Sequence, residues 1–295
     1  MAARDISFAD AGGKNKPVHH FHAEAHLISA ELEHPLKESI RPQGAVKLPR
    51  DGHYKFRKAD PYHFEGILSY RSGYTQVAGH PSKKTEGFAT LSTSVVEGLN
   101  VLDVVTADRV VAQIATVHPI YGKGQVPSVT FLGTRFENLM INGYKVEVDR
   151  GLEILGPKPA SDQSYFENRD VLDRISEQYE RIATAKDLPE WGAKEFPQSR
   201  PASNGELSCS LVKSIKGSPV SPFGHVIDLP HFGRIYLGEL KLIRKPGDKA
   251  KGIYDTYKFQ LTMVRMQMGC VGDGGVGVGI AVSNGQGSGD GGHSG

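Results

Sequence analysis

The chain has 295 residues, which is enough to bury one large hydrophobic core. Its 35 basic and 33 acidic residues give a formal net charge of +2, a balance that favours neither nucleic acid nor an anionic membrane as a partner. Two cysteines exclude a disulfide-rich scaffold and a four-cysteine zinc site. No segment is long and apolar enough for a transmembrane helix, and residues 1–17 lack the apolar run of a secretory signal, so we expect a cytoplasmic protein.

Residues 18–32 alternate between apolar and polar side chains, which is the pattern of a strand with one buried face. The apolar face holds Phe21, Ala23, Ala25 and Leu27. The polar face holds His20, His22, Glu24 and His26. After this strand, residues 33–61 contain four prolines and few apolar residues, so they are predicted to be an extended connection with little regular structure.

The middle of the chain predicts a series of strands, because short runs rich in Val, Ile, Leu and Thr are separated by turn residues. These runs cover residues 63–77, 87–94, 99–105, 109–118, 128–131, 136–141 and 144–148. Asn142 and Gly143 separate the last two runs. This dipeptide favours a two-residue type I′ hairpin turn, since both of its residues tolerate the positive φ angles that the turn needs.

One amphipathic helix is predicted within residues 161–196, where the apolar period changes to nearly four. Its apolar stripe holds Leu172, Ile175, Tyr179 and Ile182. Pro189 is expected to end the helix. The stripe needs a cover, which is either an end or a face of the sheets or another copy of the chain.

Strands resume at residues 207–215, 225–229, 233–244 and 254–268, and the last is apolar enough to be central in a sheet. Glycine then dominates, so residues 273–295 are predicted to be a flexible tail that buries too little apolar surface to offset the entropy of ordering it. Cys209 and Cys270 fall in this second half. They are either two buried thiols or a single bridge.

Two stretches resemble the bacterial choice-of-anchor P group of β proteins. The first has a strand through Arg109–Ala112 and then the run Gly133–Gly143, and the second has Gly233–Glu239 followed by Phe259–Met263. Together they cover about a third of the chain. The resemblance implies a β-sandwich and assigns no activity, and this chain departs from the group in its helical insertion and its lack of an export signal.

The predicted fold is therefore all-β, mainly an antiparallel β-sandwich, with one α-helical insertion. We expect a disordered tail at 1–17, the first half of the sandwich at 18–157, the helical insertion and a linker at 158–205, the second half at 206–272 and the flexible tail at 273–295.

The polar face of the first strand is the candidate metal site. His20, His22, Glu24 and His26 would project to one side of a strand, and imidazole and carboxylate ligands suit zinc, iron or copper. The alternative is a solvated polar face. A His-x-His pair on a strand is typical of cupin enzymes, but the glycine spacing and the second motif of that family are absent.

Two weaker patterns could also carry chemistry. Glu97, Asp103 and Asp108 could be paired acid and base carboxylates, although carboxylates in such a context are more typical of turns and sheet edges. Aromatic residues between 54 and 74 interleave with Lys55, Arg57, Lys58 and Arg71. This pattern fits either a stacking platform or, more commonly, cross-strand packing.

The absence of catalytic motifs favours a non-catalytic structural or interaction module. We expect it to form a homo-oligomer or to bind a protein partner, through a sheet edge or the inserted helix, and not to bind nucleic acid. No cofactor is expected in this case. The alternative is a metal-dependent β-barrel enzyme that holds zinc or iron with His20, His22 and His26.

Overall fold

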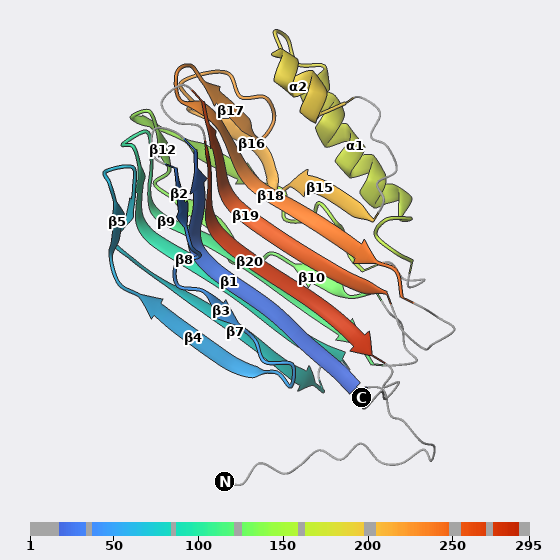
Figure 1. Ribbon diagram of the computed structural model, residues 1–295. Coiled ribbons are helices and arrows are strands. Elements are labelled where there is room, and N and C mark those ends of the chain that lie inside the picture. Colours follow the sequence, from blue (N-terminus) through green and yellow to red (C-terminus); the bar gives the residue numbers. More distant parts are fainter. Residues whose placement is uncertain are drawn as a thin grey trace, which may run out of the picture.

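The computed structural model describes residues 18–33, 37–83, 87–120, 126–158, 163–197, 205–247, 255–269 and 274–288. In these ranges the chain forms two large antiparallel sheets that lie face to face, a two-stranded ribbon and two helices (Figure 1). The predicted antiparallel sandwich with a small helical insertion is confirmed. No helix within the described ranges is long and apolar enough to span a membrane.

The first large sheet is called the β1 sheet. Its strands, in spatial order, are β15 (Glu206–Ser210), β18 (Gly233–Lys245), β19 (Thr256–Met268), β20 (Gly274–Ser288), β1 (Val18–Leu32) and β2 (Glu38–Ile40). Two further short strands join it: β17 (Val226–Leu229) pairs with β18, and β3 (Val46–Lys47) pairs with β1.

The second large sheet is called the β8 sheet. Its main order is β13 (Tyr144–Lys145), β12 (Met140–Ile141), β9 (Val105–Pro119), β8 (Gly87–Val101), β6 (Leu68–Tyr70) and β5 (Tyr62–Phe64). β7 (Ser72–Ser82) pairs with β8 and with the edge strand β4 (His53–Ala59), while β10 (Ser128–Thr130) and β11 (Arg135–Glu137) pair with β9. β14 (Glu147–Arg150) and β16 (Val212–Lys216) form the separate ribbon.

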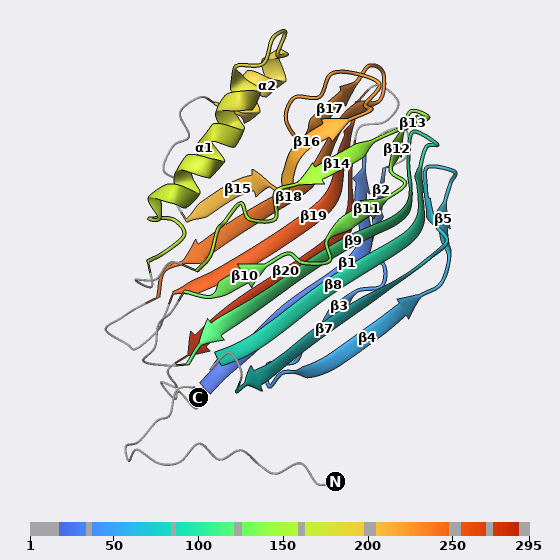
Figure 2. The same ribbon diagram turned by 180° about the vertical axis from the view of Figure 1, so that it is seen from behind.

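The core lies between the two sheets, where β1, β19 and β20 pack on β7, β8 and β9 (Figure 2). The alternation predicted for β1 is confirmed, because Phe21, Ala23, Ala25 and Leu27 are all buried against the opposite sheet. Hydroxyl groups also cross the interface. Ser92 and Ser94 of β8 donate to the backbone oxygens of Glu24 and His26, at 2.6 and 2.8 Å.

The prediction of a flexible tail at 273–295 is wrong for residues 274–288, which form β20 in the middle of the β1 sheet. β20 pairs with β19 on one side and with β1 on the other along its length. Val276, Val278 and Ala281 point into the core and are buried. The two flanking strands form hydrogen bonds with the backbone of this glycine-rich segment and so hold it in the sheet. The low apolar content of the segment does not reveal this pairing. The predicted tail at 1–17 and residues 289–295 lie outside the described residues.

A second correction concerns residues 33–61, which were predicted to be a connection with little regular structure. Residues 38–40, 46–47 and 53–59 are short strands, and 53–59 is the edge strand β4. The sequence signal is weak because six of the seven residues of β4 are exposed, so the strand lacks the buried apolar face that usually marks one.

The helical insertion contains α1 (Arg169–Ala183) and α2 (Glu190–Glu195). α1 begins where the side chain of Asn168 accepts a hydrogen bond from Val171 N at 3.1 Å. The prediction that one helix runs to Pro189 is wrong: α1 ends at Ala183, and Pro189 precedes α2, where its fixed φ suits a helix start.

α1 covers the end of the β1 sheet beside β15 (Figure 1). Ile175, Tyr179 and Ile182 of the predicted stripe are buried there, and Leu172 is half-buried. Of the two covers considered for this stripe, the structure therefore shows the sheet.

The hairpin predicted at Asn142 and Gly143 is confirmed. The two residues have φ angles of +50° and +79° and join β12 to β13. Positive φ at both central positions defines the type I′ turn, which explains why this dipeptide marks the site so clearly.

Candidate interaction surface

β4 forms an uncovered edge of the β8 sheet on the side of the molecule away from the helices (Figures 1 and 2). β4 pairs with β7 alone, so the backbone groups along its other edge have no strand partner in the described chain. Two of the four exposed large apolar side chains described in the structure lie on it: Tyr54 is 59% exposed and Phe56 is 52% exposed.

The local sequence explains how β4 presents these rings. Gly52 and His53 have positive φ angles and turn the chain into the strand, and Ala59 is buried at its far end. Tyr54 and Phe56 are two residues apart, so they lie on the same face of the sheet. On that face the Phe56 ring lies 5.6 Å from the ring of Tyr74 in β7.

The β4 strand is also strongly basic. Lys55, Arg57 and Lys58 are exposed, and the strand holds no acidic residue. None of the ion pairs found in the described chain involves these three residues. Arg57 donates a hydrogen bond to the backbone oxygen of Ala45 at 3.3 Å, which leaves its charge uncompensated. We call Tyr54, Lys55, Phe56, Arg57 and Lys58 the β4 surface.

Two further aromatic residues of this region, Tyr62 and Tyr70, pack against each other across strands. Tyr62 of β5 lies opposite Tyr70 of β6, and their rings stack with centroids 5.8 Å apart. This arrangement agrees with the interpretation of cross-strand packing. Burial raises the pKa of both phenols, as expected for hydroxyl groups removed from water.

The four candidate metal ligands lie on the outward face of β1, as predicted. His22 Nε2 is 3.4 Å from Glu24 Oε1, whereas His26 Nε2 contacts Ser29 Oγ at 3.3 Å. His20 is half-exposed on the same face. Within the described ranges, no three His, Cys, Asp or Glu side chains come close enough together to hold a metal ion.

Glu24 is paired with a lysine on a neighbouring strand. Lys47 Nζ lies 2.8 Å from Glu24 Oε1, so this carboxylate already has a cationic partner. Burial tends to raise the pKa of Glu24, but the hydrogen bond from Lys47 and the neighbouring charge of His22 outweigh it and lower the pKa. Burial lowers the pKa of His22 and His26. Zinc or iron binding at this face stays a prediction.

The candidate acid and base carboxylates are separated. Asp103 lies in the turn between β8 and β9 and is bound to Asn100, as expected for a turn residue. Glu97 and Asp108 lie inside long strands instead, because β8 and β9 each continue for 15 residues. Glu97 accepts hydrogen bonds from Ser72 at 2.6 Å and from Arg109 Nη2 at 2.5 Å, and these bonds lower its pKa.

Cys209 is buried in β15. Cys270 lies outside the described residues, so the possible bridge between the two stays a prediction.

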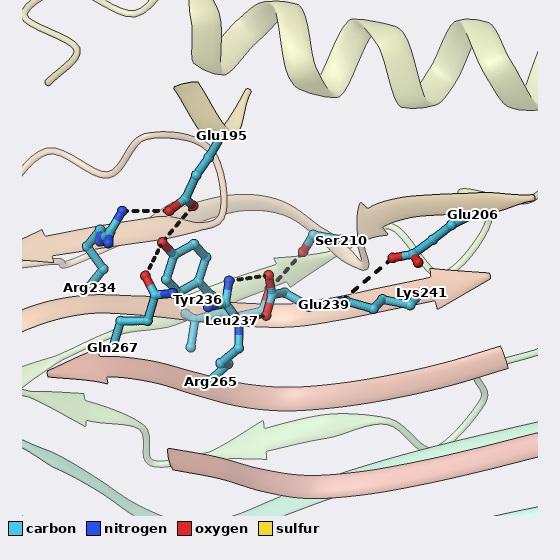
Figure 3. A network of polar contacts seen from close by, with 10 residues as sticks. All are labelled: Glu195, Glu206, Ser210, Arg234, Tyr236, Leu237, Glu239, Lys241, Arg265 and Gln267. Atoms are coloured by element: carbon cyan, nitrogen blue, oxygen red, sulfur yellow. Dashed lines mark hydrogen bonds and ion pairs between the residues drawn. The ribbon is translucent and has the colours of Figure 1, made fainter. Parts of the chain in front are cut away.

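Sequence reasoning missed a polar network on the outer face of the β1 sheet beneath the helices (Figure 3). There Arg265 of β19 forms two hydrogen bonds with Glu239 of β18, at 2.5 and 2.8 Å. Its guanidinium group also lies 3.6 Å from the centroid of the Tyr236 ring. The period-two spacing of polar residues in β18 and β19 was a usable signal, but the approach of Glu195 from the insertion was not predictable.

Comparisons with known proteins place the chain in a family. None of the curated proteins matches it. A family model described as a domain of unknown function, DUF8256, matches residues 19–243, a range that begins in β1 and ends within β18. Because this match covers most of the sequence, the chain belongs to the DUF8256 family.

Proposed function

We propose that this protein is a non-catalytic interaction module that binds an extended, acidic segment of a partner protein along β4. The observation that carries the proposal is an uncovered edge strand with two exposed aromatic rings and three uncompensated positive charges. An extended peptide can add to such an edge, where backbone hydrogen bonds supply affinity and alternate side chains supply specificity.

The aromatic rings distinguish the β4 surface from an edge that is merely protected. Lys and Arg residues alone are a common way to keep sheet edges from aggregating. Tyr54 and Phe56 serve no such purpose, because each exposes more than half of its surface to water and adds apolar area to the edge. Tyr, Phe and Arg are enriched in the buried parts of protein interfaces.

The charges favour a different protein over a second copy of the chain. If two β4 strands paired in antiparallel fashion around Phe56, Lys55 of one copy would lie opposite Arg57 of the other. Centring the pair on Arg57 would place two guanidinium groups opposite each other. Like charges directly opposite are destabilising, whereas each opposite-charge pair contributes roughly 0.2–1 kcal/mol. The predicted homo-oligomer is therefore disfavoured at β4, and the buried stripe of α1 does not offer another site.

Peptide binding tests the proposal directly. Three labelled ten-residue peptides would alternate Val with Glu, Lys or Ser, and fluorescence anisotropy would measure their affinity for the protein. We expect the Glu peptide to bind with a Kd of about 100 µM or tighter, and the Lys peptide to bind at least tenfold more weakly. Amide hydrogen exchange of residues 53–59 should slow when the Glu peptide is bound.

Charge reversal supplies the decisive variant. Lys55→Glu combined with Lys58→Glu should reverse the preference, so that the Lys peptide binds more tightly than the Glu peptide. Lys145→Glu combined with Lys216→Glu is the matched control on other exposed strands and should leave the preference unchanged. Equal binding of all three peptides, no binding of the Glu peptide at 1 mM, or an equal effect of the two double variants would refute the proposal.

A further inference from the structure

The outer face of β4 carries two aromatic rings followed by a positive charge. In the antiparallel register with β7, Lys58 lies directly opposite Tyr74, and Phe56 lies opposite Gln76. Tyr74 and Gln76 are half-buried and lie on the face of the β8 sheet that points away from the core. Successive residues of a strand alternate between the two faces, so Tyr54, Phe56 and Lys58 all lie on this outer face. A strand paired with β4 therefore meets two rings and then one cation on its outer side.

The inner face of β4 carries two positive charges in succession. Lys55 lies opposite Val77 and Arg57 lies opposite Thr75, and both of these β7 residues are buried between the sheets. The hydrogen bond from Arg57 to the backbone oxygen of Ala45 confirms that this side chain turns toward the segment before β3. Lys55 and Arg57 nevertheless remain exposed, because they lie at the edge of the sandwich. A strand paired with β4 therefore meets two cations on its inner side.

The side chains of β4 define which residue a bound strand needs at each position. Residues directly opposite each other in a sheet share a face, where opposite charges attract and apolar side chains pack on aromatic rings. The bound strand therefore needs apolar residues opposite Tyr54 and Phe56. It needs acidic residues opposite Lys55, Arg57 and Lys58. Lys58 breaks the simple alternation, because it asks for an acid on the face that otherwise takes apolar residues. The required order is thus different when it is read from the two ends.

The direction of the bound strand follows from the type of sheet. β4, β7, β8 and β9 are joined by antiparallel pairing throughout. A parallel pair is slightly less stable per residue, and sheets with one type of pairing are over-represented in proteins. Both observations favour an antiparallel strand at the free edge of β4. In this direction the first residue lies opposite Lys58 and the fifth lies opposite Tyr54, so the order from the N-terminus is acid, acid, apolar, acid, apolar.

We infer that the β4 surface binds, in antiparallel orientation, a protein segment with the order acid, acid, apolar, acid, apolar. This inference rests on the proposed function, because it specifies the sequence and the direction of the segment that β4 binds. The partner is then a protein that presents these five residues in an extended, accessible form.

Three labelled peptides with identical serine flanks test the order of residues. The forward peptide has the core Glu-Glu-Val-Glu-Val, the reverse peptide has Val-Glu-Val-Glu-Glu, and the alternating peptide has Val-Glu-Val-Glu-Val. We expect the forward peptide to bind the full chain about two- to fivefold more tightly than the alternating one, since it gains one opposite-charge pair. The reverse peptide has the same composition as the forward one. It should bind no more tightly than the alternating peptide, because no antiparallel register matches all of its residues to β4.

A single variant isolates the contact that sets the direction. Lys58→Gln should remove the difference between the forward and alternating peptides. Lys145→Gln, which changes an exposed lysine on β13, is the matched control and should preserve that difference. Both positions are exposed, so neither variant disturbs the core.

Chemical coupling reports the direction without relying on affinity. A carbodiimide joins a carboxylate to an adjacent lysine amine as an amide and takes up the water that is lost, and mass spectrometry locates the link. In the forward peptide the first Glu should be linked to Lys58 and the second residue from the end, also Glu, to Lys55. Parallel binding would instead link the second Glu to Lys55 and leave Lys58 unlinked.

The outcomes separate this inference from the proposed function. Equal affinity for the three peptides, tighter binding of the reverse peptide, or the links expected of a parallel strand would overturn the inference and leave the proposed function standing. Failure of all three peptides to bind at about 1 mM would overturn both.

Discussion

His118 makes the stability of this protein sensitive to acid. The side chain is 6% exposed in the core, its Nε2 atom has no hydrogen-bond partner, and the His19 ring lies 5.4 Å away. Burial, together with smaller effects from the neighbouring charges of His19 and Lys158, lowers the pKa of His118 to about 3. An unfolded histidine has a pKa of about 6.5.

The sign and size of the effect follow from these two pKa values. Above pH 6.5 both the folded and unfolded forms are neutral at this position, so His118 does not affect the free energy of unfolding. Between pH 6.5 and 3 His118 is protonated in the unfolded chain but stays neutral in the folded chain, so the free energy of unfolding falls as the pH is lowered. At pH 5 the loss from this one residue is about 2 kcal/mol.

Urea unfolding at pH 7 and pH 5 measures the effect. The unmodified protein should lose about 2 kcal/mol more than His118→Leu between the two pH values. His80→Leu, which replaces an exposed histidine on β7, is the control and should lose as much as the unmodified protein. If His118→Leu and the unmodified protein lost the same free energy, then His118 would not be held neutral by burial.

Three further predictions concern the fold. Gln178→Leu should lower the free energy of unfolding by about 2–4 kcal/mol, because the amide of Gln178 bonds both Ser210 N and Ser210 O, and both would be left buried without a partner. Ile175→Ala should cost about 2–4 kcal/mol by opening a cavity under α1, and Gln178→Leu and Ile175→Ala are both measured by denaturant unfolding. Gly143→Ala should cost about 1 kcal/mol, seen as a lower melting temperature, because its φ of +79° is unfavourable for alanine.

The sequence predicted those elements whose signal is local. Alternating burial defines β1, and the positive φ of Asn142 and Gly143 defines the β12–β13 turn, so neither depends on distant partners. β20 could not be predicted in the same way. Its glycines have little intrinsic preference for a strand. Its stability comes from its two neighbours in the sheet, β19, which lies just before it in the sequence, and β1, which lies near the start of the sequence.

For the candidate sites too, the local pattern could be predicted from the sequence, whereas the features that depend on distant segments could not. The interleaved aromatic and basic residues around Phe56 were visible in the sequence, but their exposure on an edge strand depends on where the sheet ends. The polar network of Glu195, Tyr236 and Arg265 needs the insertion to fold back over β18 and β19. No pattern within any one of these segments predicts that approach.

The position of β20 has a consequence for how the chain folds. Its neighbour β1 is made first and β20 is made more than 200 residues later, yet the two pair along their whole length. Until residue 288 has left the ribosome, β1 and β19 both present open edges to other nascent chains. Such distant pairing slows folding and exposes intermediates to aggregation. Cells making this protein would thus benefit from a chaperone that shields the two waiting strands, and slowing translation near the end of the message would lower its yield.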